Sequence, residues 1–183
     1  MKDARSALVE YISSEAVFHG DFVLTSGAKA KFYVDLRKVS LDHRVAPLIG
    51  EVMVDLISGI AGVSAVGGMT MGADPIATSI MHASLKTEHP LDAFVVRKQP
   101  KDHGRGRQVE GPDISGKRVV VVEDTSTTGG SPLAAIKAVE AAGAKVAAVA
   151  VVVDRNTGAK EAIEAAGYSY LAALGLEDLG LTK

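Results

Sequence analysis

The chain has 183 residues, 47% of them hydrophobic and 23% charged, which fits a single globular domain spanning residues 1–183. Twenty basic and 22 acidic side chains give a formal net charge of −2, which argues against a general binder of nucleic acid or membrane surfaces. There is no cysteine, so disulfides, thiolate metal sites and cysteine nucleophiles are excluded, and we expect a cytoplasmic location.

Apolar spacing predicts the secondary structure. In chain order the elements are a helix over residues 3–15, strands over 22–25 and 32–36, a helix over 46–57, a strand over 65–68, a helix over 75–85, strands over 93–96 and 118–122, a helix over 131–142, a strand over 146–153, a helix over 159–166 and a strand over 168–174. Alternating apolar strands and helices are typical of a parallel sheet covered on both faces. We therefore predict an α/β fold, with an open, mainly parallel twisted sheet flanked by helices and ligands at the carboxyl ends of its strands.

Some details of this prediction concern the ends of the elements. Residues 1–40 are less regular than the rest and are expected to form a small N-terminal hood over the edge of the sheet. Pro75 suits the first position of the helix that it opens. Ser131 and Pro132 suit the N-cap and first position of the next helix, which Gly143 ends.

Residues 98–117 lack apolar periodicity, and a structureless stretch of this length in a compact domain is usually functional. Residues 97–107, called the basic segment below, carry one acid, Asp102. The cations of this segment are Arg97, Lys98, Lys101, Arg105 and Arg107. In a net-acidic protein this segment is a candidate anion site, to which His103 can also donate. The alternative is an ordinary solvated charged loop.

The strongest chemical signal runs from Val119 to Ser131. Four valines form a buried strand, two acids follow at its end, and hydroxyls and glycines then lead into a helix. A helix N-terminus favours phosphate, and glycines let the backbone close around it. The hydroxyl donors are Thr125, Ser126, Thr127, Thr128 and Ser131, and the glycines are Gly129 and Gly130.

Glu123 and Asp124 cannot serve the phosphate, because carboxylates would repel it, but they suit the hydroxyls of a neighbouring ribose. The segment therefore predicts a sugar phosphate site. It contains neither a Walker A loop nor a dinucleotide-binding glycine motif. The alternative is a capped turn with incidental acids.

Two further residues are ambiguous on their own. Arg155 follows a buried strand and could be an ordinary surface residue, but ligands of such sheets bind at this end of the strands. A guanidinium there suits a planar carboxylate, which it can bind in bidentate fashion. Tyr33 lies in an alternating strand and could equally be a core residue.

These segments resemble those of a known family, the type I phosphoribosyltransferases, and among them orotate phosphoribosyltransferase. Residues 123–130, Glu-Asp-Thr-Ser-Thr-Thr-Gly-Gly, resemble the motif that binds phosphoribosyl pyrophosphate (PRPP). Residues 97–104 resemble the family's mobile catalytic loop, and residues 24–27 and 32–37 its N-terminal orotate-side segment. Residues 153–155 resemble the strand end whose arginine contacts the substrate carboxylate.

The resemblance implies the type I phosphoribosyltransferase fold and transfer of the phosphoribosyl group of PRPP to orotate. It implies Mg²⁺, held mainly through PRPP and not by protein ligands. It also implies a homodimer in which the basic loop acts in trans, and Tyr33 near the pyrimidine. The implied catalytic residues are Lys101, His103 and Asp124, and the implied substrate-binding residues are Tyr33, Arg97, Lys98, Lys101, His103, Glu123, Asp124, Thr125, Ser126, Thr127, Thr128, Gly129, Gly130, Ser131 and Arg155.

Two departures from the family pattern remove positive charge: Thr25 and Gly72 stand where many members carry lysine. Two other functions stay open. A purine or uracil phosphoribosyltransferase would share the phosphate motif without needing an arginine for a carboxylate. A non-enzymatic RNA-binding regulator on the same fold would need a basic face outside the loop, and the even distribution of charge speaks against it.

Overall fold

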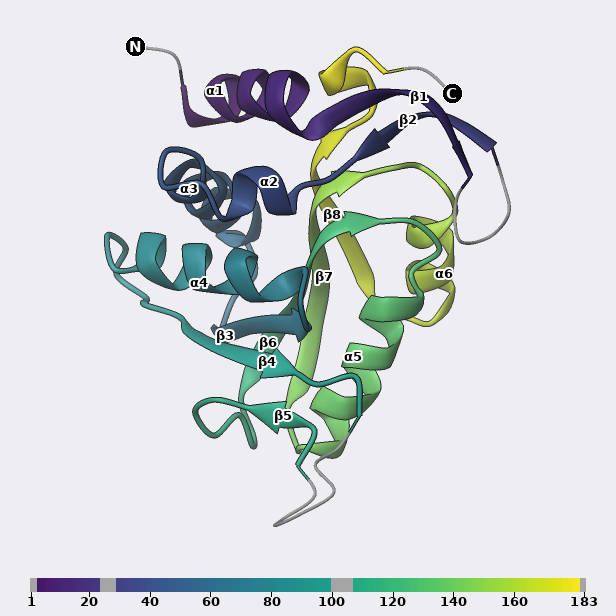
Figure 1. Ribbon diagram of the computed structural model, residues 1–183. Helices are drawn as coiled ribbons and strands as arrows, with labels where there is room; N and C mark the ends of the chain where they lie inside the picture. The colour runs from purple at the N-terminus through teal and green to yellow at the C-terminus, as the bar shows by residue number, and fades with distance from the viewer. Residues whose placement is uncertain (1–2, 24–28, 100–106, 182–183) are drawn as a thin grey trace.

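A computed structural model describes residues 3–23, 29–99 and 107–181 of the chain (Figure 1). The helices are α1 (Ala4–Tyr11), α2 (Arg37–Ser40), α3 (Ala46–Ile57), α4 (Ala73–Ser84), α5 (Gly130–Ala141) and α6 (Ala159–Ala165), with a π-helical turn η1 (Ile12–Ala16) and a 3₁₀ turn η2 (Glu177–Leu179). The strands are β1 (Val17–Val23), β2 (Lys29–Val34), β3 (Val63–Met69), β4 (Asp92–Val96), β5 (Val109–Glu110), β6 (Arg118–Ser126), β7 (Lys145–Asp154) and β8 (Ser169–Gly175). Within these residues no helix has the length and apolar character needed to cross a membrane.

The central sheet has six strands in the order β5-β4-β3-β6-β7-β8. All of its neighbouring strands run parallel except β5, which pairs antiparallel with β4. The α/β fold predicted from the sequence, with its mainly parallel sheet, is confirmed. Strands β3 and β6 are neighbours although they are far apart in the chain, so the loops that follow them meet at one end of the sheet.

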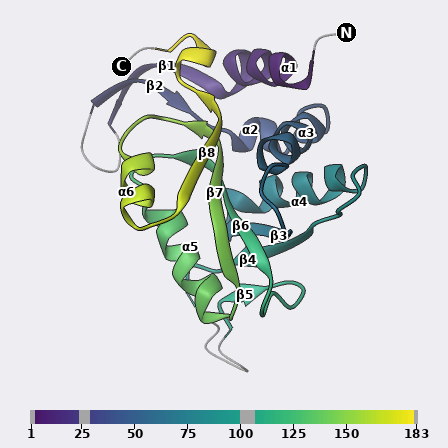
Figure 2. The same cartoon turned by 180° about the vertical axis from the view of Figure 1, so that it is seen from behind.

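Side chains of β6 point alternately to the two faces of the sheet, as the pleat requires. Val120 and Val122 join the core cluster formed with α1, α3 and α4. Val119 and Val121 join the second cluster, formed with α5 and α6. Figures 1 and 2 show α3 and α4 on one side of the sheet and α5 and α6 on the other. The run of four consecutive valines therefore reflects the burial of this strand on both faces of the sheet, where every side chain must be apolar.

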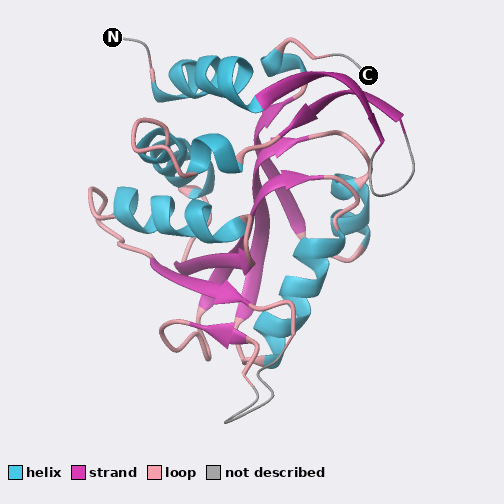
Figure 3. Cartoon of the chain, in the orientation of Figure 1, coloured by secondary structure: helices cyan, strands magenta, loops and turns pink. Residues whose placement is uncertain are grey.

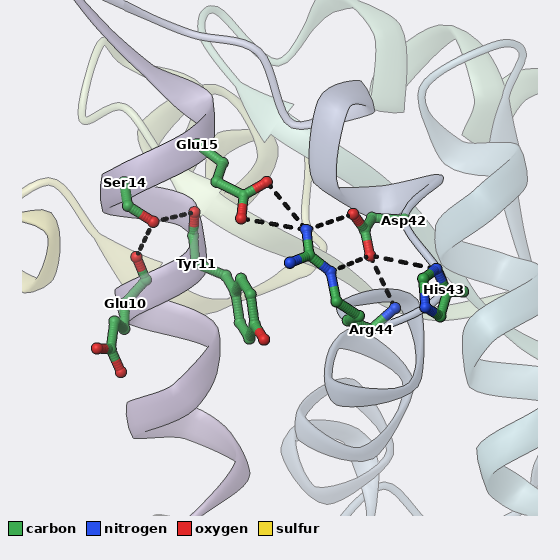
Figure 4. A network of polar contacts seen from close by, with 7 residues as sticks. All are labelled: Glu10, Tyr11, Ser14, Glu15, Asp42, His43 and Arg44. Carbon is green, nitrogen blue, oxygen red and sulfur yellow. Dashed lines mark hydrogen bonds and ion pairs between the residues drawn. The ribbon is translucent and has the colours of Figure 1, made fainter.

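The N-terminal hood is a separate two-stranded antiparallel sheet of β1 and β2, which Figure 3 sets apart from the central sheet. Ion pairs fasten the helical segment before it to the loop between α2 and α3 (Figure 4). One nitrogen of the Arg44 guanidinium lies 3.2 Å from a carboxylate oxygen of Glu15 and 2.8 Å from one of Asp42. The hydrogen bond from Arg44 holds the pKa of Asp42 well below its usual range.

The sequence placed several boundaries wrongly. The predicted strand over 118–122 continues to Ser126, because the polar residues after Val122 keep pairing with β7 up to the Ser126–Asp154 pair. Ser131 and Pro132 are the second and third residues of α5, and Gly129, at φ 79°, is its N-cap. Proline is tolerated there because the first turn of a helix leaves its N–H groups free.

Two short elements and the start of one helix differ from the sequence-based prediction, and part of one predicted strand is not described by the structure. The helix predicted from Pro75 begins at Ala73 instead. Strand β5 and the single turn α2 carry no apolar repeat from which they could have been predicted. The end of the strand predicted over residues 22–25 lies outside the described residues.

Helices α3 and α4 approach each other at Gly50. A Cβ atom at this position would lie 2.3 Å from the backbone oxygen of Ser79. Because backbone cannot rotate away as a side chain can, we predict that Gly50→Ala lowers the free energy of unfolding by about 1–3 kcal/mol. Urea denaturation measures the change. Gly59→Ala is the control, since nothing lies within 4 Å of a Cβ atom there, and an equal loss in both variants would contradict the explanation.

Candidate active site

Residues 123–132 line a cavity of about 180 Å³ at the carboxyl end of β6. Helix α5 begins in this wall with Gly129 as its N-cap in a left-handed backbone conformation. The free N–H groups of its first turn and the exposed side chains of Thr127, Thr128 and Ser131 surround the space. The loop predicted to hold phosphate thus forms a concave wall at a helix N-terminus, a geometry that suits an anion.

A second cavity of about 280 Å³ adjoins the first, and Glu123, Asp124, Thr125 and Ser131 line both. Its other walls come from three separate parts of the chain: the end of β2 and start of α2, the loop after β3, and the foot of the basic segment. These residues are Tyr33, Val34, Asp35, Leu36, Arg37, Met69, Thr70, Met71, Gly72 and Lys98. The two cavities together offer an elongated site with the acid pair at the junction.

The acid pair has two different environments. Glu123 is only 7% exposed, and this burial, together with the nearby charge of Asp124, raises the pKa of its carboxyl to about 8. Asp124 is less buried, and its Oδ1 accepts the backbone N–H of Thr125 at 2.6 Å. Glu123 therefore stays mostly protonated near neutral pH, which halves the negative charge that the pair would otherwise carry.

The loop after β3 packs directly against this pair. A Cβ atom at Gly72 would lie 2.8 Å from Oδ1 of Asp124. Further along the loop, the hydroxyl of Thr70 donates to Oδ2 of Asp74 at 2.7 Å. The position at which many relatives carry lysine thus holds a glycine that makes room for the Asp124 carboxylate.

Arg155 lies just after β7, with the centre of its guanidinium 5.9 Å from the ring centroid of Tyr33. The residue is 8% exposed, and its guanidinium donates no hydrogen bond within residues 3–23, 29–99 and 107–181. Tyr33 lines the second cavity, whereas Arg155 lines neither cavity. The structure thus brings Arg155 and Tyr33 together beside the second cavity, and the guanidinium keeps its donors available for an anionic planar group.

Arg37 also lines the second cavity, although no role was predicted for it. Its Nε donates to Oδ1 of Asp35 at 3.0 Å, and this hydrogen bond raises the pKa of the guanidinium. The only available signal was its place at the end of the quoted segment 32–37, directly after a strand. No sequence rule distinguishes such a residue from an ordinary surface arginine.

Two predicted binding residues have other partners in the structure. Ser126 belongs to the wall of the first cavity, but it is 2% exposed and its hydroxyl contacts Asp154 and Tyr170. Arg97 lies at the foot of the basic segment, with its Nη1 3.7 Å from the carboxylate of Glu110, and lines neither cavity. Lys98 lines the second cavity. Lys101 and His103, like Thr25, lie outside the described residues.

The described residues contain no group of three or more histidines, cysteines or acids that could hold a metal ion alone. The carboxylates of Glu123 and Asp124 are nevertheless the hard oxygen donors that Mg²⁺ prefers. They fit an ion whose other ligands come from the phosphates of a substrate.

A phosphoribosyl transferase domain model matches residues 64–166 of the chain. Orotate phosphoribosyltransferase of Tropheryma whipplei (strain Twist) is 58% identical over 178 residues, which are 97% of this chain and 83% of that protein. The crystal structure of Mycobacterium tuberculosis H37Rv orotate phosphoribosyltransferase in complex with Fe(III) dicitrate superposes with a TM-score of 0.87 at 53% identity, covering 97% of this chain and 99% of that one. The same enzyme in complex with PRPP gives a TM-score of 0.83 at 49% identity, covering 97% and 99%.

The raised pKa of Glu123 predicts a pH dependence of stability in the ligand-free protein. Between its unfolded value of 4.5 and its folded value of about 8, the folded chain binds more protons than the unfolded chain. The free energy of unfolding should therefore fall as pH rises through this window, by up to about 1.4 kcal/mol per pH unit from this group. Glu123→Gln should flatten that slope.

Chemical denaturation at intervals from pH 5 to pH 8 measures the slope. Glu164→Gln, at an exposed position of α6, is the matched control and should keep the wild-type slope. Identical slopes in all three proteins would show that Glu123 ionises normally.

Proposed function

The chain belongs to the orotate phosphoribosyltransferase family, and on this premise we propose that it transfers the phosphoribosyl group of PRPP to orotate. The products are orotidine 5′-monophosphate and pyrophosphate, as required in de novo pyrimidine (UMP) biosynthesis. The observation that carries the proposal is the guanidinium of Arg155, nearly buried beside Tyr33 and next to a phosphate-binding loop. A substrate with a carboxylate and a planar ring can bind Arg155 through the carboxylate and contact Tyr33 through the ring.

In this proposal, three groups of residues bind different parts of the substrates. The loop Thr127–Ser131 holds the 5′-phosphate with hydroxyls and backbone N–H groups at the start of α5. Glu123 and Asp124, at the junction of the cavities, accept hydrogen bonds from the ribose hydroxyls. Arg155 and Tyr33 hold the carboxylate and face of orotate, whose ring nitrogen attacks the anomeric carbon.

The reaction is a substitution that passes through a state with positive charge on the ribose, while negative charge grows on the departing pyrophosphate. Stabilising these charges and positioning the reactants is the main task, and no protein nucleophile is needed. Lys98, Lys101 and His103 neutralise the leaving group in this proposal. Mg²⁺, when bound through PRPP, supplies further positive charge beside the pyrophosphate oxygens.

We propose that the protein works as a homodimer, and one groove supports this. It measures about 1090 Å³ between the α2–α3 region and α4, and Leu41 and Met71 line it with exposures of 75% and 68%. Its wall carries both signs of charge, Glu51 and Lys86, so a second copy of the same surface could pair opposite charges across a two-fold axis. Because Met71 also lines the substrate cavity, a copy seated there would reach the active site of its partner.

On the cysteine-free composition we place the reaction in the cytoplasm.

The first test measures pyrophosphate release from Mg²⁺–PRPP with orotate, uracil and adenine. Only orotate should react. Arg155→Ala should reduce kcat/KM for orotate by about 10- to 150-fold, the worth of one charged hydrogen bond, and change the KM for PRPP little. Arg118→Ala, at the opposite end of the sheet, is the control and should behave like the wild type. A wild-type protein that uses uracil as readily as orotate would refute the assignment of Arg155.

The trans action of the basic loop is testable by mixing two inactive proteins, Lys101→Ala and Asp124→Asn. If the loop serves the neighbouring subunit, each mixed dimer has one site with both defects and one with neither. Random exchange should then restore about a quarter of the sites, since half of the dimers are mixed. If the loop serves its own subunit, the mixture stays inactive. That outcome, with subunit exchange demonstrated and both parents folded and dimeric, would end the trans-loop proposal.

A further inference from the structure

Beneath the phosphate loop lies a buried polar cluster that the reaction described above does not use. The hydroxyl of Ser126 at the end of β6 lies 3.0 Å from Oδ1 of Asp154 at the end of β7. It also lies 2.6 Å from the hydroxyl of Tyr170 on β8. Both Ser126 and Tyr170 are buried, so the cluster joins the carboxyl ends of β6 and β7 to the side chain of Tyr170, the second residue of β8, inside the protein.

The direction of these hydrogen bonds follows from which groups can donate a proton and which can only accept one. The carboxylate of Asp154 can only accept, so Ser126 donates to it, and Tyr170 must then donate to Ser126. Burial raises the pKa of Tyr170, which keeps the proton on its hydroxyl. The cluster is therefore an ordered chain of donors that ends on the Asp154 carboxylate.

Asp154 in turn holds the turn that carries Arg155. Its Oδ1 accepts the backbone N–H of Asn156 at 2.8 Å, and Asn156 has a left-handed backbone, with φ 52°. The backbone N–H of Arg155 donates to the carbonyl of Ser126 at 3.3 Å. The hydroxyl of Thr157 donates to the carbonyl of Thr127 at 2.7 Å. Together with the Ser126–Asp154 contact, three hydrogen bonds thus join residues 154–157 to Ser126 and Thr127 at the start of the phosphate loop.

We propose that Tyr170 is a positioning residue, acting through Ser126 and Asp154 to hold the Arg155 guanidinium at a fixed distance from the phosphate loop. This rests on the proposed function, in which Arg155 binds the orotate carboxylate. The product joins that carboxylate and the 5′-phosphate in one molecule, so the spacing of the two binding groups bears on how well the reactants align. Tyr170 itself touches no substrate and is not a catalytic residue.

A cluster this well buried could equally serve stability alone, and the two roles predict different measurements. A stabilising role lowers the melting temperature and leaves the kinetic constants unchanged. A positioning role changes the constants for the ligand group that Asp154 orients. The phosphate loop is also held by the β6 ladder and the start of α5, so the loss should fall mainly on orotate.

The test is Tyr170→Phe, which removes one hydroxyl and keeps the aromatic packing. The matched control is Tyr168→Phe, because the Tyr168 hydroxyl donates at 2.8 Å to Glu140 at the surface, away from the site. Pyrophosphate release gives kcat and both KM values. We expect the KM for orotate to rise about 3- to 10-fold in Tyr170→Phe, as for one lost hydrogen bond, with a smaller change for PRPP and wild-type values in Tyr168→Phe.

The Arg155→Ala background separates positioning from a general loss. If Tyr170 acts through Arg155, adding Tyr170→Phe to Arg155→Ala causes no further fall in kcat/KM for orotate. An equal fall in both backgrounds, or a lower melting temperature with unchanged KM values, would overturn the positioning role while leaving the proposed function intact. A wild-type protein that fails to convert orotate would refute the proposed function first, and this role with it.

Discussion

Strand β6 is covered on both faces, and this constraint organises the site. After the exposed Arg118, its four valines are fully buried, and no polar side chain follows until the strand nears the end of the sheet. Glu123 is the first polar residue after them and is still mostly buried, which explains why its pKa is raised. Asp124 and Thr125 are partly exposed, Ser126 is buried again, and from Thr127 the chain is exposed and can turn toward a ligand. The polar residues after the valines therefore lie where the strand leaves the core, with Ser126 as the residue that still points inward.

The sequence predicts well those features that depend on a residue and its near neighbours. Helix α3 has the bounds expected from its apolar repeat, and the valine run of β6 could only be a strand buried on both faces. Gly129 after it is the N-cap of α5 in a left-handed conformation, which glycine adopts without steric cost.

Features that depend on distant partners were not predictable. The hydroxyl of Ser126 reads as a phosphate donor beside Thr127 and Thr128, and only the fold reveals Asp154 and Tyr170 as its partners. β6 continues through polar residues because β7 supplies its hydrogen bonds, which no local pattern encodes. Arg37 enters the site because the end of β2 meets the loop after β3, a contact set by tertiary packing.

The electrostatics of the two cavities explain why the basic segment matters. Within the described part of the chain, the cations lining them are Arg37 and Lys98, and Arg37 is already paired with Asp35. Against them stands the Asp124 carboxylate, which occupies the space that a side chain at position 72 would need, while Glu123 stays mostly protonated. A lysine at position 72 would have to displace the acid assigned to the ribose, so position 72 adds no positive charge. Within these walls Lys98 is thus the unpaired cation left for a departing pyrophosphate. In the proposed reaction the further positive charge comes from the rest of segment 97–107, which has five cations and one acid.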